Sequence, residues 1–151
     1  MVTLNQINEF MDAQTFGLVG ASRNPKKFGY AAFKELKDKG MKIVPVNPFA
    51  DEIYGSSVFH DVKSLPEDVK GLIIMTKKSE TPAVIRDAKE KGIRQIWIQQ
   101  MADSVEAIKE LEGTGINFIT GECILMHFKP HSFHKFHAAI LKLFRRFPRL
   151  E

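Results

Sequence analysis

A glycine-rich loop between Gly20 and Gly29 combines the residue types that bind phosphate groups. Its sequence is GASRNPKKFG, and it lies between an apolar run and a helical pattern. The hydroxyl group and the cations of this loop belong to Ser22, Arg23, Lys26 and Lys27. Backbone N–H groups and the positive end of a helix dipole attract anions at such a position. A tight turn without a ligand would also need Gly20, but the accompanying hydroxyl and cations favour a nucleotide phosphate site.

The common nucleotide-binding motifs are absent from the sequence. A dinucleotide-binding loop reads G-x-G-x-x-G, and an acidic residue at the end of the next strand holds the ribose. Here the loop has one early glycine, and the next apolar run ends VPVNP, with Asn47 and Pro48 in place of an acid. The motif G-x-x-x-x-G-K-[ST] does not occur either. These differences exclude a P-loop nucleoside triphosphatase and argue against ordinary NAD recognition.

Five short apolar runs must supply the strands that position this loop. They read TFGLVGAS, MKIVPVNP, GLIIMT, QIWIQQ and INFIT, and helical or loop patterns separate them. The runs are rich in Ile and Val and hardly alternate, which is typical of parallel strands that are covered on both faces. We therefore expect an α/β fold: a Rossmann-like, doubly wound sheet of five parallel strands with helices on both faces. For these strands we predict the order 3-2-1-4-5.

The helical segments have recognisable ends. Ser79 is expected to cap the helix that ends at Gly92. Asp103, with Glu106 three residues later, resembles a capping box for the next helix. Outside the sheet we expect a short helix near the N-terminus and an amphipathic helix over 132–147, packed through apolar side chains at helical spacing. The side chains expected to pack this C-terminal helix are Phe136, Ile140 and Phe144.

Ligands of such folds bind at the carboxyl ends of the strands. The residues that follow the apolar runs are polar and partly basic. They are Gly20, Ala21, Ser22, Arg23, Asn47, Pro48, Thr76, Lys77, Lys78, Gln99, Gln100, Thr120, Gly121, Glu122 and Cys123. We expect the binding site among them.

The order of the motifs resembles the CoA-binding-domain proteins, a family similar to the N-terminal CoA-binding domain of the succinyl-CoA synthetase α subunit. The motifs are LVGAS with a downstream FGY, then VPVNP, PEDV, IWIQQ and GEC, from about Thr15 to about Cys123. The resemblance implies a site for coenzyme A or an acyl-CoA. The residues that it implies for this site are Gly20, Ala21, Ser22, Arg23, Lys26, Lys27, Gly29, Tyr30, Asn47, Pro48, Met75, Thr76, Gln99 and Cys123.

In the synthetases that this chain resembles, catalysis uses a phosphorylated histidine in a second domain and a partner subunit. This chain has neither, so we expect a stand-alone binding module without catalytic residues. Two enzyme hypotheses stay open: an NAD(P)-dependent oxidoreductase, and an acyl-CoA-handling enzyme that uses Cys123. A lone cysteine is more often a small buried apolar residue than a nucleophile.

Four of the five histidines lie close together in the sequence, and their pattern favours neither catalysis nor metal binding. His127, His131, His134 and His137 fall in HFKPHSFHKFH, where Pro130 interrupts the segment and no cysteine or acid lies between them. Metal sites need ligands on one face together with a third ligand. We therefore expect no metal site, and we interpret this segment as a basic amphipathic cap over one edge of the sheet.

The composition limits the class of protein. With 151 residues, of which 44% are hydrophobic, residues 1–151 are expected to form a single CoA-binding domain. One cysteine and an N-terminus without a signal-like pattern predict a cytoplasmic protein. No apolar run approaches the roughly 20 residues of a membrane span. The net charge of +4 allows an acidic small-molecule ligand, but the basic residues lack the aromatic interleaving of nucleic-acid binders. Homo-oligomerisation stays open.

Overall fold

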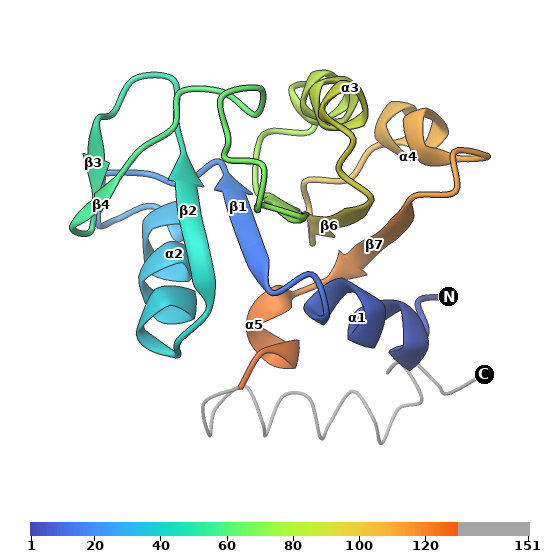
Figure 1. Ribbon diagram of the computed structural model, residues 1–151, viewed down its shortest axis with the longest axis horizontal. Helices are drawn as coiled ribbons and strands as arrows, with labels where there is room; N and C mark the ends of the chain where they lie inside the picture. Colours follow the sequence, from blue (N-terminus) through green and yellow to red (C-terminus); the bar gives the residue numbers. More distant parts are fainter. Residues whose placement is uncertain (130–151) are drawn as a thin grey trace.

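The five apolar runs form one parallel sheet in the order β2-β1-β5-β6-β7 (Figure 1). The computed structural model describes residues 1–129. The strands are β1 (Thr15–Val19), β2 (Lys42–Val46), β5 (Gly71–Ile74), β6 (Gln95–Gln99) and β7 (Asn117–Glu122). All four residues of β5 are buried, as expected for a strand that is covered on both faces. The predicted five-stranded parallel α/β sheet is confirmed.

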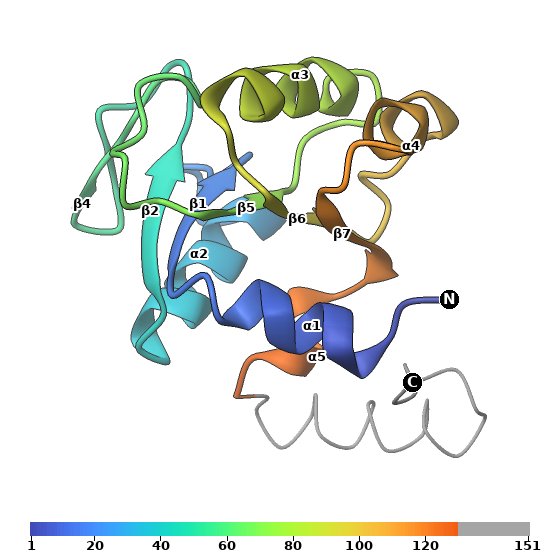
Figure 2. The same cartoon turned by 45° about the vertical axis from the view of Figure 1, so that its right-hand side comes forward.

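Helices cover both faces of this sheet, as Figures 1 and 2 show. One face carries α1 (Leu4–Met11), α2 (Phe28–Asp38) and α5 (Ile124–His127), and the other carries α3 (Thr81–Lys91) and α4 (Val105–Leu111). Each face has its own apolar core. Phe10 of α1 packs on Trp97 of β6 with 5.4 Å between the ring centroids, whereas Ile85 of α3 and Leu111 of α4 are buried on the opposite face.

The predicted strand order 3-2-1-4-5 is wrong. Numbering the main strands along the chain, the order is 2-1-3-4-5, because β5 lies between β1 and β6. The segment between β2 and β5 contains no crossover helix; it forms a small antiparallel hairpin of β3 (Glu52–Ile53) and β4 (Ser56–Ser57). The segment then crosses β1, where a Cβ added at Gly17 would lie 3.1 Å from Leu65 Cδ1. The glycine therefore leaves room for the crossing chain, which enters the sheet on the far side of β1.

Two predicted helix caps are each shifted by one residue. The N-cap of α3 is Glu80 rather than Ser79, and its side chain makes no capping hydrogen bond. The N-cap of α4 is Ser104 rather than Asp103, since the Ser104 hydroxyl accepts the N–H of Ala107. Asp and Ser are both preferred N-cap residues, so residue type alone could not separate Asp103 from Ser104, and helix ends in any case vary by about one or two residues. The predicted end of α3 at Gly92 is confirmed by its left-handed backbone conformation, with φ 82°.

Some expectations concern residues outside the described range. The C-terminal helix and His131, His134 and His137 belong to residues 130–151, which lie beyond it. Within residues 1–129, no helix is both long and apolar enough to cross a bilayer. In the same range, no cluster of three or more His, Cys, Asp or Glu side chains could hold a metal ion.

Candidate functional site

A cavity of about 440 Å³ opens at the carboxyl edge of the sheet, where β1, β2 and β5 end. The helix that follows β1 covers one face of the sheet, and the helix that follows β5 covers the other. Such a change of side between neighbouring strands is where α/β sheets bind their ligands. The lining residues are Val19, Gly20, Ala21, Ser22, Lys27, Phe28, Gly29, Val46, Asn47, Pro48, Phe49, Met75, Thr76 and Glu80.

The wall of the cavity next to β1 is built by two glycines in direct contact. Gly20 has a φ of +94°, and a Cβ on it would lie 2.6 Å from the carbonyl oxygen of Met75. A Cβ on Gly29 would lie 2.0 Å from the carbonyl oxygen of Gly20. Any side chain at either position would therefore displace backbone. The contact brings the first turn of α2, whose leading N–H groups lack partners within the helix, against the end of β1.

Hydrogen bonds within the loop hold its polar groups in place. Ser22 Oγ accepts the N–H of Asn24 at 3.1 Å, and Asn24 Oδ1 accepts the N–H of Lys26 at 3.0 Å. Because a hydroxyl group that accepts a hydrogen bond keeps its own hydrogen, Ser22 can still donate to an anion. Lys27 is exposed, is the N-cap of α2 and lines the cavity. The loop thus offers a hydroxyl group, an ammonium group and a helix N-terminus on one side of the cavity.

Asn47 connects the loops that follow β1 and β2. Its Nδ2 donates to the carbonyl of Ala21 at 2.8 Å, and its Oδ1 accepts the N–H groups of Phe49 and Ala50 at 2.8 and 3.1 Å. Arg23 Nη1 adds a bond to the carbonyl of Phe49 at 3.4 Å. The side chain of Asn47 therefore shapes the wall of the cavity through the backbone.

Two exposed aromatic rings lie at the cavity. Phe49 is 84% exposed and Phe28 is 50% exposed. The backbone of Phe49 is fixed by hydrogen bonds with the side chains of Asn47 and Arg23. Exposed aromatic faces offer stacking surfaces to planar ligand groups. The cavity therefore combines polar and cationic groups, of the kinds that can bind phosphate, with apolar walls.

The structure brings most of the sequence-predicted site residues together. Those that line the cavity are Gly20, Ala21, Ser22, Lys27, Gly29, Asn47, Pro48, Met75 and Thr76. Arg23 and Lys26 belong to the same loop but do not line the cavity. The lining residues that sequence reasoning missed are Val19, Phe28, Val46, Phe49 and Glu80. The signal for the two phenylalanines was their place directly beside the polar loops, whereas nothing in the sequence distinguished Glu80 from other exposed acids.

Three predicted site residues lie elsewhere. Tyr30 packs edge-on against Tyr54 of the β3–β4 turn, with 6.0 Å between the ring centroids. Gln99 is 5% exposed, and its Oε1 accepts the N–H of Ile124 at 3.1 Å. Cys123 is buried at the N-cap of α5. Each of these side chains packs or hydrogen-bonds within the protein, and none of the three lines the cavity.

A hydrogen-bonded pair, Glu122 and His127, flanks Cys123 in the chain. His127 Nε2 lies 3.1 Å from Glu122 Oε2, and the His127 side chain is 4% exposed. The backbone carbonyl of Glu122 accepts a hydrogen bond from the Trp97 indole at 3.1 Å, and the Trp97 and His127 rings lie 5.4 Å apart. The group therefore joins the middle of β6 to the ends of β7 and α5.

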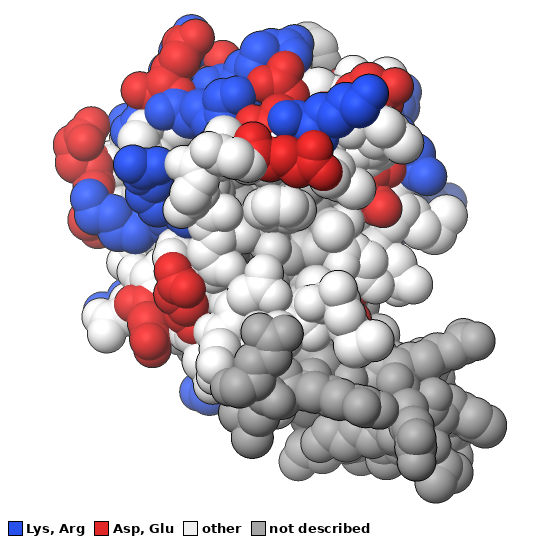
Figure 3. All heavy atoms as spheres, turned by 90° about the vertical axis from the view of Figure 1, so that its right-hand side faces the viewer, with Lys and Arg blue, Asp and Glu red and all other residues white. Residues whose placement is uncertain are grey.

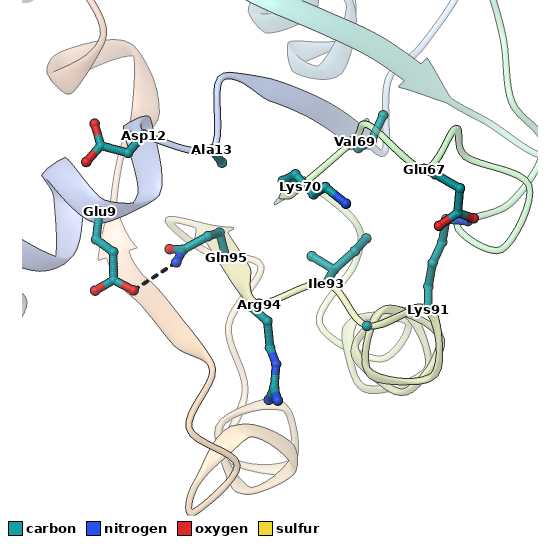
Figure 4. A pocket seen from close by; sticks show the side chains of 11 residues that line it. Glu9, Asp12, Ala13, Glu67, Val69, Lys70, Lys91, Ile93, Arg94 and Gln95 are labelled. Carbon is teal, nitrogen blue, oxygen red and sulfur yellow. Dashed lines mark hydrogen bonds and ion pairs between the residues drawn. The ribbon is translucent and has the colours of Figure 1, made fainter.

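A second cavity, of about 320 Å³, lies at the opposite edge, where β5 and β6 begin (Figure 4). Its side chains carry both signs of charge, and several are paired. Gln95 donates to Glu9 at 2.9 Å, and Lys91 lies 3.2 Å from Glu67. Because parallel sheets bind ligands at their carboxyl ends, the 440 Å³ cavity is the candidate site.

Charges of both signs also mix on the surface of α3 and α4, in the upper part of Figure 3. Glu110 of α4 pairs with Arg86 at 2.9 Å and with Lys89 at 2.8 Å, both from α3. This face therefore lacks the continuous basic surface that nucleic-acid backbones require.

Comparison with known proteins agrees with this geometry. A family model described as the CoA binding domain matches residues 14–129. The chain is 33% identical over 93 residues to the α subunit of ADP-forming acetate–CoA ligase II from Pyrococcus furiosus, which is 61% of this chain and 20% of that protein. It is 26% identical over 120 residues to the uncharacterized protein YneT of Bacillus subtilis, which is 79% of this chain and 89% of that protein.

A solved structure of a conserved hypothetical protein from Pyrococcus furiosus is also similar. It is 36% identical and has a TM-score of 0.73, over 76% of this chain and 98% of that chain. By contrast, the chain spans about one fifth of the length of the ligase α subunit. The family that the sequence motifs indicated is confirmed, and this chain belongs to the CoA-binding domain family.

Proposed function

We propose that this protein binds coenzyme A or an acyl-CoA in the carboxyl-edge cavity and catalyses no reaction of its own. The contact between Gly20 and Gly29 carries the proposal, because it packs the first turn of α2 against the end of β1 and so brings the N-terminus of this helix to the cavity, where it can attract a pyrophosphate. Ser22 and Lys27 lie on the same side of the cavity. The ADP-forming acetate–CoA ligases, which this chain matches in part, have coenzyme A in their names.

The apolar wall next to β2 suits the adenine ring. Phe49 and Pro48 lie beyond the end of β2 and line the cavity. Base stacking on an aromatic ring contributes about 1–3 kcal/mol. The ring of Phe49 is exposed, and the backbone N–H of this residue donates to Asn47. With the phosphates over β1, the adenosine would thus lie toward β2.

The same cavity is poorly suited to NAD. A ribose diol needs a free acceptor at the end of the second strand. Asn47 occupies that position, and its amide group already bonds Ala21, Phe49 and Ala50. We therefore favour CoA over a nicotinamide dinucleotide.

We also propose that residues 1–151 act as one domain in the cytoplasm, with a small molecule as the partner. The single cysteine supports this placement, since it leaves no disulfide framework within the chain.

Calorimetric titration with CoA, dephospho-CoA and NAD at fixed salt tests the ligand. CoA carries one more phosphate than dephospho-CoA, and a charge-assisted phosphate contact contributes about 1.5–3 kcal/mol. Affinity should therefore fall about ten-fold or more from CoA to dephospho-CoA, and further to NAD. If NAD bound as tightly as CoA, or dephospho-CoA were indistinguishable from it, the proposal would be wrong.

Lysine variants connect this preference to the loop. The double substitution Lys26→Ala and Lys27→Ala should shrink the preference for CoA over dephospho-CoA. Lys109→Ala, which removes an exposed cation from α4, is the matched control and should leave the preference unchanged.

A further inference from the structure

A hydrogen-bonded pair of threonines lies just beyond the end of β5, next to the cavity. Thr76 lines the cavity, and its Oγ1 lies 3.0 Å from Oγ1 of Thr81 in α3. Thr81 is completely buried, and its Oγ1 also lies 2.8 Å from the carbonyl oxygen of Ala102 and 3.2 Å from that of Lys77. Four oxygen atoms thus share two hydroxyl hydrogens.

The chemistry of these oxygens fixes the direction of the bonds. Carbonyl oxygens only accept, and a hydroxyl group has a single hydrogen. If Thr81 donated to Thr76, its oxygen would face the Ala102 carbonyl at 2.8 Å with no hydrogen between them, in a site without solvent. Thr81 therefore donates to a carbonyl, and Thr76 donates to Thr81. The hydrogen of Thr76 points away from the cavity.

Thr76 consequently offers only lone pairs to a ligand. The nearby Glu80 carboxylate, which also lines the cavity, accepts hydrogen bonds and repels phosphate. Lys27 and the N-terminus of α2 provide positive charge on the other side. The cavity thus has a phosphate-binding side over β1 and an acceptor side over β5.

We infer that Thr76 Oγ1 accepts a hydrogen bond from a donor group on the pantetheine arm of the bound CoA. This inference rests on the proposed function. If the phosphates lie over β1 and the adenosine lies toward β2, the rest of the ligand passes across the end of β5, on the opposite side of β1. The pantetheine arm carries amide N–H and hydroxyl groups, which match an acceptor, whereas the phosphates do not.

Adenosine 3′,5′-bisphosphate tests the two halves of CoA separately, because it has the adenosine part of CoA but lacks the pantetheine arm. Thr76→Val should weaken CoA binding about five- to ten-fold, since one hydrogen bond is lost and a ligand donor loses its partner. The affinity for adenosine 3′,5′-bisphosphate should change less than about two-fold. Thr76→Ser keeps the oxygen and should bind CoA within about two-fold of the wild type. These fold-changes are measured by calorimetry at fixed salt.

Two further variants control for the fold. Thr15→Val makes the same exchange at the start of β1, away from the cavity, and should leave both affinities unchanged. Thr76→Ala provides a second test if Thr76→Val does not fold.

Equal weakening of both ligands by Thr76→Val would mean that Thr76 contacts the nucleotide, and no weakening of either would mean that it contacts no ligand. Each result would overturn the inference while the CoA assignment stands. Failure of the wild-type protein to bind CoA would instead overturn the proposed function, and the inference with it.

Discussion

Gly20 and Gly29 determine how closely α2 can approach the end of β1. The space between them is so small that a Cβ on Gly29 would lie 2.0 Å from the Gly20 carbonyl oxygen. An ordinary helix gains up to about 1 kcal/mol of stability when glycine is replaced by alanine. Glycine at position 29 therefore lowers the helix propensity of α2 but allows the close contact with Gly20.

Replacing Gly29 by alanine should therefore destabilise the protein and damage the site. We expect the free energy of unfolding to fall by about 1–3 kcal/mol, because overpacking outweighs the gain in helix propensity. The affinity for CoA should fall with it, since the turn has to shift. Urea unfolding and calorimetry measure the two effects.

Gly113→Ala is the control for this substitution. A Cβ there meets no atom within 4 Å, although the φ of +73° makes the backbone unfavourable for alanine. The Gly113→Ala substitution should lower the free energy of unfolding but leave the affinity for CoA unchanged. A Gly29→Ala protein as stable as the wild type would contradict the close packing described for this turn.

At the scale of elements, the β3–β4 hairpin is attached to α2 through its turn. The Tyr54 hydroxyl donates to Asp38 Oδ1 at 2.8 Å, and Lys34 Nζ lies 2.9 Å from Asp38 Oδ2. The ammonium groups of Lys34 and Lys37 also lie 5.2 and 5.5 Å from the centre of the Tyr54 ring. This attachment holds the segment that leads from β2 toward β5.

The attachment should make stability depend on pH. The hydrogen bond from Lys34, followed by the one from Tyr54, lowers the pKa of Asp38 below its ordinary value of 3.8. A lowered pKa stabilises the folded protein above pH 3.8, and this contribution is lost as the pH falls through the folded-state pKa. The free energy of unfolding of Asp38→Asn should therefore lie below that of the wild type at neutral pH, and the difference should shrink in acid.

Urea unfolding of both proteins across this pH range measures the difference. Asp12→Asn is the control, because no hydrogen bond or ion pair of the Asp12 side chain is found within residues 1–129. A gap between wild type and Asp38→Asn that stayed constant into acid would show that Asp38 does not act through its charge.

At the scale of the whole molecule, the two edges of the sheet have different character. The carboxyl edge has a turn of two glycines, a helix N-terminus and exposed aromatic rings. The amino edge has a cavity with charges of both signs. All five strands point the same way, so one edge collects every loop that follows a strand.

Removing cations from the amino edge should accordingly leave ligand binding intact. The double substitution Lys70→Ala and Arg94→Ala takes two positive charges from the 320 Å³ cavity. We expect the affinity for CoA to stay within about two-fold of the wild type, because screening reduces charge effects across the domain. Calorimetry at physiological ionic strength checks this. A loss as large as that caused by the double substitution Lys26→Ala and Lys27→Ala would indicate that the ligand binds at the amino edge instead.

The local features of this protein could be predicted from the sequence. Unalternating Ile and Val runs predicted the five parallel strands, and apolar spacing predicted the helices between them. The pair Gly20 and Gly29 predicted the turn, because backbone conformation and close approach depend on the absence of a side chain at those positions. Most of the residues that line the cavity follow strands, so the fold class alone indicated them.

Only the tertiary structure decided which strands are neighbours and what each polar side chain does. In the order 2-1-3-4-5 the chain crosses β1, where Leu65 lies close to Gly17, and residues so far apart in the chain have no shared local pattern. The side chain of Asn47 bonds the loop after β1, that of Gln99 bonds the start of α5, and that of Thr76 bonds Thr81 of α3. A side chain's role depends on its partners, and folding brings those partners together from separate elements.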